Sequence, residues 1–280
     1  MSARVLSLSS TPHSNCRDLL VAFSKLYRGN FMPPHCYLVY DLLYEPENTD
    51  VVVELSPNGE VESYVLLWRG LYEFALHVWG PNSYELFKRV ALSPERPVRV
   101  VLYGDGEGVE RVSSRLLELG FEEVEVKEFY EMSCTEEAFL PSKSERLAVR
   151  LTSDHVELFE EYMRSRGVEL TLEEAQGILA KRRYYGVILE GKLVSTAATC
   201  VELREIHVVC DVYTRPEFRD RGYAEAATSA VTRRAVASGA VAFLSVETGN
   251  EPAVRLYAKL GYRVVGVRPW VVARPKRRGP

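Results

Sequence analysis

The chain has 280 residues, of which 46% are hydrophobic and 26% charged, which is typical of a folded globular protein with room for two domains. A net charge of −4 gives no overall attraction for nucleic acid or for an anionic membrane. No apolar stretch approaches the roughly 18 residues of a transmembrane helix, and the N-terminus lacks the pattern of a signal peptide. We therefore expect a cytoplasmic protein that binds neither nucleic acid nor membrane.

The cysteines are odd in number and scattered along the chain. No two of them have the CxxC spacing that is common in metal sites and redox motifs. They predict reduced, mostly buried thiols, with neither a metal site nor a disulfide framework. The five are Cys16, Cys36, Cys134, Cys200 and Cys210.

The N-terminal half alternates strand-like and helix-like patterns from residue 51 onward. A hairpin is indicated by two alternating apolar runs joined at Asn58-Gly59. A glycine, Gly120, follows the last helical pattern, as is common at a helix C-terminus. The predicted elements are a hairpin at 51–68, strands at 73–79, 98–103 and 121–132, and helices at 83–90 and 109–119.

A segment rich in polar residues and containing proline, CTEEAFLPSKSE at 134–145, separates two patterned regions and predicts a linker. The predicted domains are therefore residues 1–140 and 146–274. In the second, a hairpin turns at Glu190-Gly191, and Gly239 and Gly261 follow helical patterns. Its elements are strands at 147–152, 184–203 (the hairpin), 205–214, 241–248 and 262–273, and helices at 156–166, 172–182, 224–238 and 250–260.

The order of these elements, β–α–α–β–β–β–α–β–α–β, predicts a mixed α/β (α+β) layer architecture. The two halves also share a local match, because LLELGFEEVEVKEFYEM lines up with LYAKLGYRVVGVRPWVV. We interpret this as an internal duplication of one fold. The alternative is chance, since the sequence helix–glycine–aromatic–strand recurs in many α/β proteins.

The motif Arg219-x-x-Gly222-x-Ala224 lies directly between a strand and a helix. Glycine lets the backbone approach an anion closely, and the helix that follows offers unpaired N–H groups and a positive dipole end. Arg219 and Arg221 add charged donors. In isolation such a motif is more often an ordinary strand–helix loop. A second motif, NEPAVRLYAKLGY at 250–262, follows after another strand and strengthens the functional interpretation.

These two motifs together resemble the GNAT superfamily of N-acetyltransferases, and most closely its glycine N-acyltransferase-like branch. The resemblance covers residues 185–270 and becomes weaker toward Leu147. It implies a mostly antiparallel mixed sheet flanked by helices, present twice in this chain, with the N-terminal copy degenerate. It also implies transfer of an acetyl group from acetyl-CoA, as cosubstrate and without a metal, to a primary amine in a ternary complex.

The resemblance places acetyl-CoA between the strands that end at Thr214 and Thr248. The strand backbone would pair with the pantetheine arm, the loop N–H groups would hold the pyrophosphate, and Asn250 would reach the pantetheine. The cofactor-binding residues implied are Val212, Tyr213, Thr214, Arg219, Asp220, Arg221, Gly222, Tyr223, Ala224 and Asn250.

The resemblance also places Tyr257 near the thioester sulfur, as the catalytic residue. The leaving thiolate has a pKa near that of cysteine, roughly 8.5, so a phenol of pKa about 10 can protonate it. The alternative is a core tyrosine on the helix face shared with Ala253 and Leu260.

The base that deprotonates the amine is left open by the sequence. In relatives a glutamate stands midway along the strand before the loop, but here that place falls at Val208 or Val209. A water chain or an amine of low pKa would serve instead. The other candidates nearby are Glu205, His207, Asp211 and Glu247.

The N-terminal half has GPNSYELFKRV where the second half has its loop motif, so we expect it not to bind CoA. Three function classes stay open: an acetyltransferase, a non-catalytic module that binds acyl-CoA, and a structural protein. For the enzyme we expect a small-molecule amine or a peptide or protein amine as acceptor, entering between the two halves. The oligomeric state is expected to be monomer or homodimer.

Overall fold

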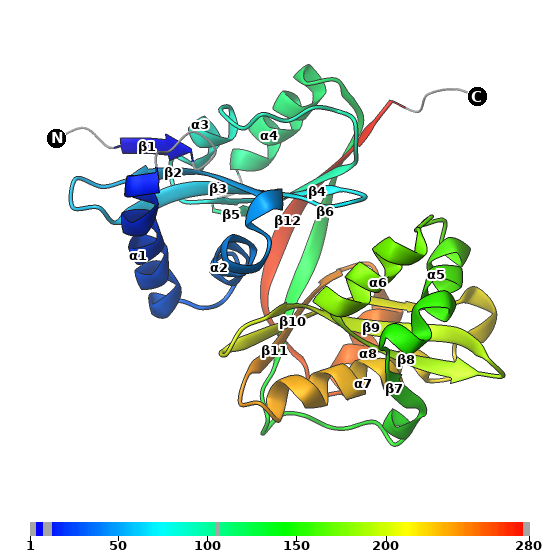
Figure 1. Cartoon of the computed structure of the whole chain (residues 1–280). Helices are drawn as coiled ribbons and strands as arrows, with labels where there is room; N and C mark the ends of the chain where they lie inside the picture. The colour runs from blue at the N-terminus through cyan, green and yellow to red at the C-terminus, as the bar shows by residue number, and fades with distance from the viewer. Residues whose placement is uncertain (1–3, 8–12, 105–106, 277–280) are drawn as a thin grey trace. The chain divides into compact units, whose positions relative to one another are not determined.

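The computed structural model describes residues 4–7, 13–104 and 107–276, and the chain forms two compact units. The first unit runs to Phe129 and takes up the chain again from Val267, and the second consists of Tyr130–Gly266. In each unit a mixed sheet carries helices on both faces (Figure 1). The expected α/β architecture, with a sheet flanked by helices, is confirmed.

The first unit packs its helices in two pairs. Leu19, Phe23 and Leu38 join the apolar core on one face of the sheet, whereas Phe87 and Leu116 join the core on the other. Its strands follow the order β1-β2-β3-β4-β5, with β12 next to β5. The elements are β1 (Arg4–Ser7), α1 (His13–Gly29), α2 (His35–Tyr44), β2 (Thr49–Leu55), β3 (Val61–Arg69), β4 (Phe74–Trp79), α3 (Ser83–Phe87), β5 (Val98–Tyr103), α4 (Glu107–Glu118) and β6 (Phe121–Cys134).

The second unit has the same plan. Phe159 and Leu179 place α5 and α6 on one face, and Ala227, Val231 and Tyr257 place α7 and α8 on the other. Its strands follow the order β7-β8-β9-β10-β11, with β6 next to β11. The elements of this half of the chain are β7 (Ala148–Arg150), α5 (Val156–Ser165), α6 (Leu172–Lys181), β8 (Arg183–Leu189), β9 (Lys192–Glu202), β10 (Ile206–Thr214), α7 (Tyr223–Val236), β11 (Val241–Glu247), α8 (Glu251–Lys259) and β12 (Arg263–Pro275), which enters the first unit at Val267.

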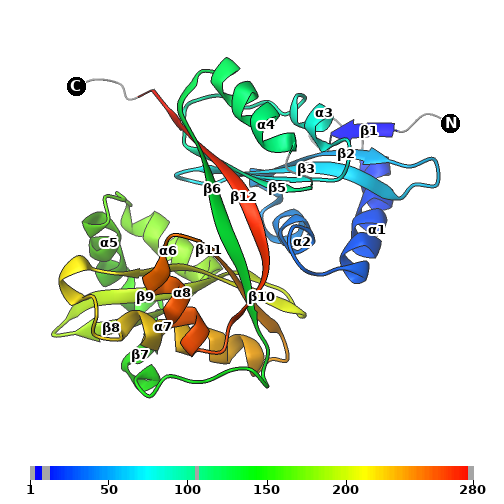
Figure 2. The ribbon, with the colours of Figure 1, turned by 180° about the vertical axis from the view of Figure 1, so that it is seen from behind.

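The two halves of the chain repeat one order of elements, β1 to β6 and then β7 to β12. Equivalent glycines end equivalent helices, because Gly120 after α4 and Gly261 after α8 have φ angles of 92° and 93°. The long strands β6 and β12 lie side by side, and each pairs with the sheet of the other half (Figure 2). The N-terminal elements β1, α1 and α2, for which the sequence made no prediction, complete the first copy.

The segment predicted as a linker is packed against the second unit. The N–H of Leu140 donates to the Leu260 carbonyl at 3.0 Å, and the N–H of Ser142 donates to Ser229 Oγ at 2.9 Å. The compact units therefore divide at Phe129 and Val267, because β6 and β12 each run from one unit into the other. The domain limits predicted from the sequence, 1–140 and 146–274, describe the two repeated halves of the chain and not these compact units. They remain a prediction.

The expectation that all cysteines are reduced was wrong for one pair. Cys200 on β9 and Cys210 on β10 form a disulfide, whereas Cys36 and Cys134 are free and buried. Spacing in sequence could not reveal the pair, because only the antiparallel pairing of β9 with β10 brings them to a Cα–Cα distance of 5.9 Å. The side chain of Cys16 lies outside the described part of the chain. Among the described helices, none is both long and apolar enough to span a membrane.

Candidate active site

The strands β10 and β11 pair over a short distance and then diverge. Their parallel pairing covers three positions, from Ile206 opposite Val241 to Val208 opposite Phe243. Both strands continue beyond this point, β10 to Thr214 and β11 to Glu247, without further pairing to each other in this fully described stretch. The diverging strands leave backbone groups of β10 without a strand partner on that side. An extended ligand arm can pair with these groups.

Strand β10 is irregular next to this opening. Its register with β9 shifts between Val208 and Val209, and again between Cys210 and Tyr213. Asp211, inside the second irregularity, has a φ of 50°, a left-handed conformation that is uncommon for a residue other than glycine. Such bulges bend a strand and redirect side chains, and they are frequent beside active sites.

The loop after β10 presents backbone N–H groups at the start of α7. Asp220 and Gly222 both have positive φ angles, 60° and 77°, and Gly222 is the N-cap of the helix. The N–H of Ala226, bonded to the Gly222 carbonyl at 3.0 Å, makes the first backbone bond of the helix. The N–H groups of Tyr223 to Glu225 therefore lie free at the positive end of the helix dipole. The predicted loop can hold a phosphate group.

Two arginines of this loop are exposed and one neighbouring arginine is not. Arg219 donates from Nε to the Thr214 carbonyl at 3.2 Å and lies over the ring of Tyr213. Arg221 is exposed and lies over the ring of Phe218. Arg215, in contrast, is buried and donates to the Leu193 carbonyl at 2.8 Å and to Glu161 at 2.6 Å. Arg219 and Arg221 can reach a bound anion, whereas Arg215 is engaged in the fold.

Tyr257 lies in the apolar cluster of the helices α7 and α8, together with Val209 of β10 and Val246 of β11. Its side chain is 7% exposed, and its hydroxyl makes no hydrogen bond to a described residue. Burial raises the pKa of Tyr257 to about 12, so the phenol is protonated at neutral pH, as a proton donor must be. Its position fits both the core role and the catalytic role that the sequence left open.

Asn250 has a structural task at the start of α8. Its Oδ1 accepts the N–H of Ala253 at 3.3 Å and caps α8. The residue is exposed, and its side-chain amide nitrogen makes no hydrogen bond within the described residues. That nitrogen is the group with which Asn250 would contact a pantetheine carbonyl.

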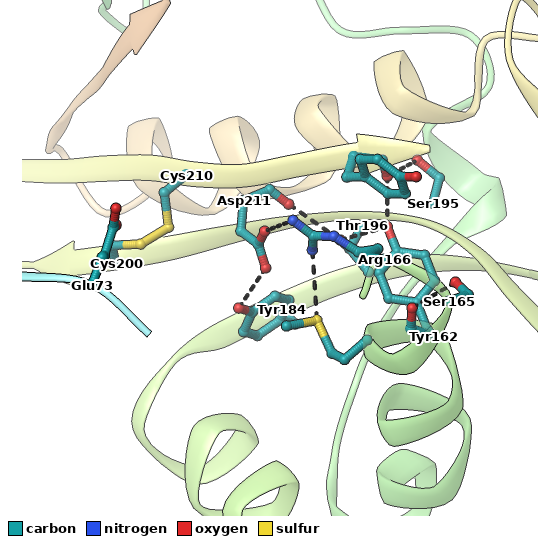
Figure 3. Close-up of polar contacts among 12 residues, drawn as sticks. Glu73, Tyr162, Ser165, Arg166, Tyr184, Ser195, Thr196, Cys200, Cys210 and Asp211 are labelled. Carbon is teal, nitrogen blue, oxygen red and sulfur yellow. Dashed lines mark hydrogen bonds and ion pairs between the residues drawn. A yellow bond between two sulfur atoms is a disulfide. The ribbon is translucent and has the colours of Figure 1, made fainter. Parts of the chain in front are cut away.

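A charged and aromatic cluster surrounds Asp211 on the face of the sheet covered by α5 and α6 (Figure 3). The hydroxyl of Tyr184 donates to Asp211 Oδ2 at 2.7 Å, and Arg166 Nη2 lies 2.7 Å from Oδ1. The guanidinium of Arg166 also lies over the ring of Tyr213, at 4.6 Å from its centroid. Burial and, to a smaller extent, the Asp211 charge raise the pKa of Tyr184. Arg166 and Tyr184 therefore hold the carboxylate in a fixed orientation.

The backbone of Tyr213 is fixed from the same face. Its carbonyl accepts a hydrogen bond from the Tyr162 hydroxyl at 2.8 Å and one from Ser195 Oγ at 3.1 Å. The hydroxyl of Tyr162 is also 3.1 Å from Thr196 Oγ1. The structure thus adds Arg166, Tyr162 and Tyr184 to the surroundings of the site. The sequence offered no pattern for them, because they come from α5, its C-cap and β8 and meet β10 only in the fold.

The other candidate bases do not lie on the unpaired part of β10. His207 is opposite Ala242, where β10 and β11 are still paired; it is 3% exposed, and burial lowers its pKa. Glu205 precedes β10 and Glu247 ends β11. Val208 and Val209, which stand where a glutamate was expected, are buried. Asp211 is the carboxylate on β10 beyond the point of divergence.

The first unit lacks the equivalent opening. Its strands β4 and β5, which correspond to β10 and β11, pair at six positions, from Phe74 opposite Val98 to Trp79 opposite Tyr103. A side chain at Gly80 would meet the Glu62 carbonyl and Ser63. The N–H of Asn82, before the short helix α3, is already bonded to Ser63 Oγ at 3.0 Å. No gap between strands is present at this place, and the N–H groups of Ser83 and Glu85 at the start of α3 are bonded to the carbonyls of Gly80 and Asn82.

We expect the full chain to bind one CoA molecule and not two, because β4 and β5 are paired to their ends. Isothermal titration calorimetry of the intact protein with CoA should give a stoichiometry near one per chain. A stoichiometry near two would show that the first unit binds CoA despite its closed strands.

Comparison with known proteins agrees with this geometry. Residues 184–271 match the family described as FR47-like protein. No curated protein matches the chain significantly. The described residues contain no group of three His, Cys, Asp or Glu side chains that could hold a metal ion.

Several solved structures share the fold over nearly the whole chain. A Drosophila protein has a TM-score of 0.67 at 16% identity, with 98% of each chain covered. A GCN5-related N-acetyltransferase-like protein from Streptococcus suis has a TM-score of 0.62 at 16% identity, covering 93% of this chain and 99% of its own. A tandem GNAT protein from the clavulanic acid biosynthesis pathway has a TM-score of 0.58 at 11% identity, covering 100% and 99%. The chain has the GNAT acetyltransferase fold, its two halves repeat one order of elements, and residues 184–271 are similar to the FR47-like family.

Proposed function

We propose that the protein is an N-acetyltransferase that moves an acetyl group from acetyl-CoA to a primary amine. The observation that carries this proposal is the divergence of β10 and β11 after three paired positions, followed directly by Gly222 at the start of α7. An open strand for the arm and a free helix N-terminus for the pyrophosphate occur together only in the second unit, among the described residues. An acyl-CoA has the two matching parts, an extended pantetheine arm and a pyrophosphate.

In this proposal the backbone of Val212, Tyr213 and Thr214 pairs with the pantetheine arm. The N–H groups from Asp220 through Arg221, Gly222 and Tyr223 to Ala224 hold the pyrophosphate, supported by the exposed guanidinium groups of Arg219 and Arg221. Asn250 contacts the arm through its free amide nitrogen. The hydrogen bonds from Tyr162 and Ser195 to the Tyr213 carbonyl keep this strand in place before the ligand arrives.

The reaction is a direct attack within a ternary complex. The amine nitrogen forms a bond to the thioester carbonyl carbon, and the bond from carbon to sulfur breaks. The proton that the ammonium must lose passes to Asp211, either directly or through water, and from there to solvent. The departing thiolate takes the proton of the Tyr257 hydroxyl, which is then replaced from solvent.

The acceptor in this proposal is a primary amine, of a small molecule or of a peptide or protein. The glycine N-acyltransferase-like branch, a cytoplasmic location and a monomeric or homodimeric state remain hypotheses. The most direct test incubates acetyl-CoA with a panel of amines and measures thiol release, beside calorimetric binding of CoA. Turnover of at least one amine supports the enzyme.

A second candidate function is a module that binds acyl-CoA without catalysis. It is favoured by one observation: the place of the expected glutamate is taken by Val208 and Val209, which are 3% and 4% exposed. Tight CoA binding with no thiol release above the uncatalysed rate, for any amine of the panel, would select this function over the enzyme.

The proposed role of Asp211 predicts a selective defect. Asp211→Asn keeps the shape and removes the charge, so kcat/KM for the amine should fall by about 10²-fold or more. The Kd for CoA should stay within about twofold, because the loop at Gly222 is untouched. The matched control is Glu202→Gln, which removes a carboxylate of β9 that pairs with Arg183 instead. Equal activity of Asp211→Asn and the wild type would exclude Asp211 as the proton acceptor.

A further inference from the structure

The disulfide between Cys200 and Cys210 joins β9 and β10 where neither strand is regular. Val208 is opposite Val201 and Val209 is opposite Thr199, so Cys200 is the extra residue of a bulge in β9. Cys210 is opposite Ala198 and directly precedes the bulge of β10, which ends where Tyr213 is opposite Thr196. The covalent bond therefore fixes the register between two adjacent irregularities.

The second irregularity contains Asp211. Figure 3 shows Cys210 next to Asp211 on β10, with the disulfide on one side and the contacts to Arg166 and Tyr184 on the other. The left-handed φ of 50° at Asp211 is disfavoured for a side chain with a Cβ. It persists only where the surroundings determine it, and the disulfide is the one covalent constraint among them in the described chain.

We propose that the Cys200–Cys210 disulfide is a redox switch that sets the position of Asp211 and thereby controls amine turnover. The oxidised form holds the bulge and the carboxylate in place. In the reduced form the bulge is free to shift along β9 and β10, and a shift by one residue turns side chains to the opposite face of the sheet. The proposal rests on the proposed function, in which Asp211 accepts the proton of the amine.

The switch is ordinary thiol–disulfide exchange with a dithiol. One thiolate of the dithiol attacks a sulfur of the pair and forms a mixed disulfide, and its second thiolate then displaces the protein sulfur. The dithiol loses two electrons and two protons and becomes a disulfide. The protein disulfide takes them up, so Cys200 and Cys210 become two thiols. Both cysteines are half-buried, so a reagent can reach them, whereas the free Cys36 and Cys134 are buried.

Reduction should affect the two substrates differently. The pyrophosphate loop begins at Arg219 and depends on Gly222 and the first turn of α7, which are not attached to either cysteine. The carboxylate of Asp211 follows Cys210 directly. The backbone of Val212 to Thr214, the proposed partner of the pantetheine arm, directly follows the bulge. We therefore expect CoA binding to weaken when the disulfide is reduced, but by less than amine turnover falls.

The first measurement establishes the bond. The protein is denatured without reductant, alkylated and weighed by mass spectrometry. With the disulfide present, two more cysteines should be alkylated after dithiothreitol than before it, and peptide mapping should identify them as Cys200 and Cys210. Five reactive thiols in the untreated protein would overturn the proposal.

The second measurement compares the oxidised protein with protein reduced by dithiothreitol, which needs no variant. We expect kcat/KM for the amine to fall about tenfold or more on reduction, with a smaller rise in the Kd for CoA, because the pyrophosphate loop is untouched. Hydrogen exchange of the amides in 209–214 should become faster on reduction, while that of α7 stays the same. Unchanged exchange in 209–214 would overturn the proposal even if no amine substrate had been found.

The variant Cys200→Ser/Cys210→Ser should behave like the reduced wild type and no longer respond to dithiothreitol. Cys134→Ser, which removes a free thiol outside the bond, is the control and should keep the full response. Absence of turnover in both redox states, together with the expected change in exchange, would contradict the proposed function and not the switch. A double variant as active as the oxidised wild type would refute the switch.

Discussion

Replacing Gly222 with valine is expected to abolish CoA binding, with Kd raised by about 10²-fold or more, while the protein stays folded. Gly222 has a φ of 77°, where a side chain with a Cβ costs roughly 1–2 kcal/mol. A Cβ there meets no described atom closer than Ser144 Oγ at 3.9 Å, so packing adds nothing to this cost. Binding is affected more strongly, because the valine side chain occupies the space next to the N–H groups that hold the pyrophosphate.

The other end of the same helix offers the matched control. Gly239 has a φ of 81°, and a Cβ at this position would meet no described atom within 4 Å, so Gly239→Val imposes the same backbone strain away from the loop. Both variants should lose a few degrees in Tm, but only Gly222→Val should lose CoA in calorimetry. If Gly222→Val binds CoA as tightly as Gly239→Val does, the phosphate site is elsewhere.

Replacing Tyr257 with phenylalanine is expected to lower kcat by about 10²–10⁴-fold, the usual size of general acid catalysis. The Kd for CoA should change little, because the phenol acts on a leaving group that exists only in the transition state. The fold should tolerate the change, since the Tyr257 hydroxyl makes no hydrogen bond to a described residue and its removal leaves no partner unsatisfied.

The pH dependence and a neighbouring tyrosine sharpen this test. Burial raises the pKa of Tyr257 to about 12, so the phenol is protonated throughout the range from about pH 6 to about pH 9, and the defect should be equally large across it. Tyr262→Phe is the control, because this neighbouring buried tyrosine shares a hydrogen bond with Thr232 and its ring lies 5.9 Å from the Tyr257 ring. A loss of less than a few-fold in Tyr257→Phe would make Tyr257 a core residue only.

The fold was predictable from the sequence where its signals are local. Alternation of apolar residues indicated the strands, and Gly120 and Gly261 end the equivalent helices with almost the same φ. The position of β6 and β12 was not predictable, because strand partners depend on pairing between distant residues. Strand β6 lies next to β11 in the sheet, and the second unit begins at Tyr130. A shortened protein that begins at Ser144 would therefore lack β6 and would not be an intact second unit.

The site divides in the same way. The loop at Gly222 could be predicted from sequence, because its chemistry depends on a contiguous glycine and helix start. The cluster around Asp211 could not, since Arg166 follows α5, Tyr184 lies on β8, and only the fold joins them to β10. The disulfide could not be predicted for a related reason. Its two cysteines are brought together by the pairing of β9 with β10, and the register of that pairing contains a bulge.

The most direct test of the central claim is a crystal structure of the intact chain with CoA. We expect the pyrophosphate on the N–H groups between Arg219 and Ala224, and the pantetheine arm between β10 and β11 beyond Val208. The sulfur should lie near the Tyr257 hydroxyl. Bound CoA at any other place, with the backbone of Val212 to Thr214 and the start of α7 uncontacted, would contradict the account.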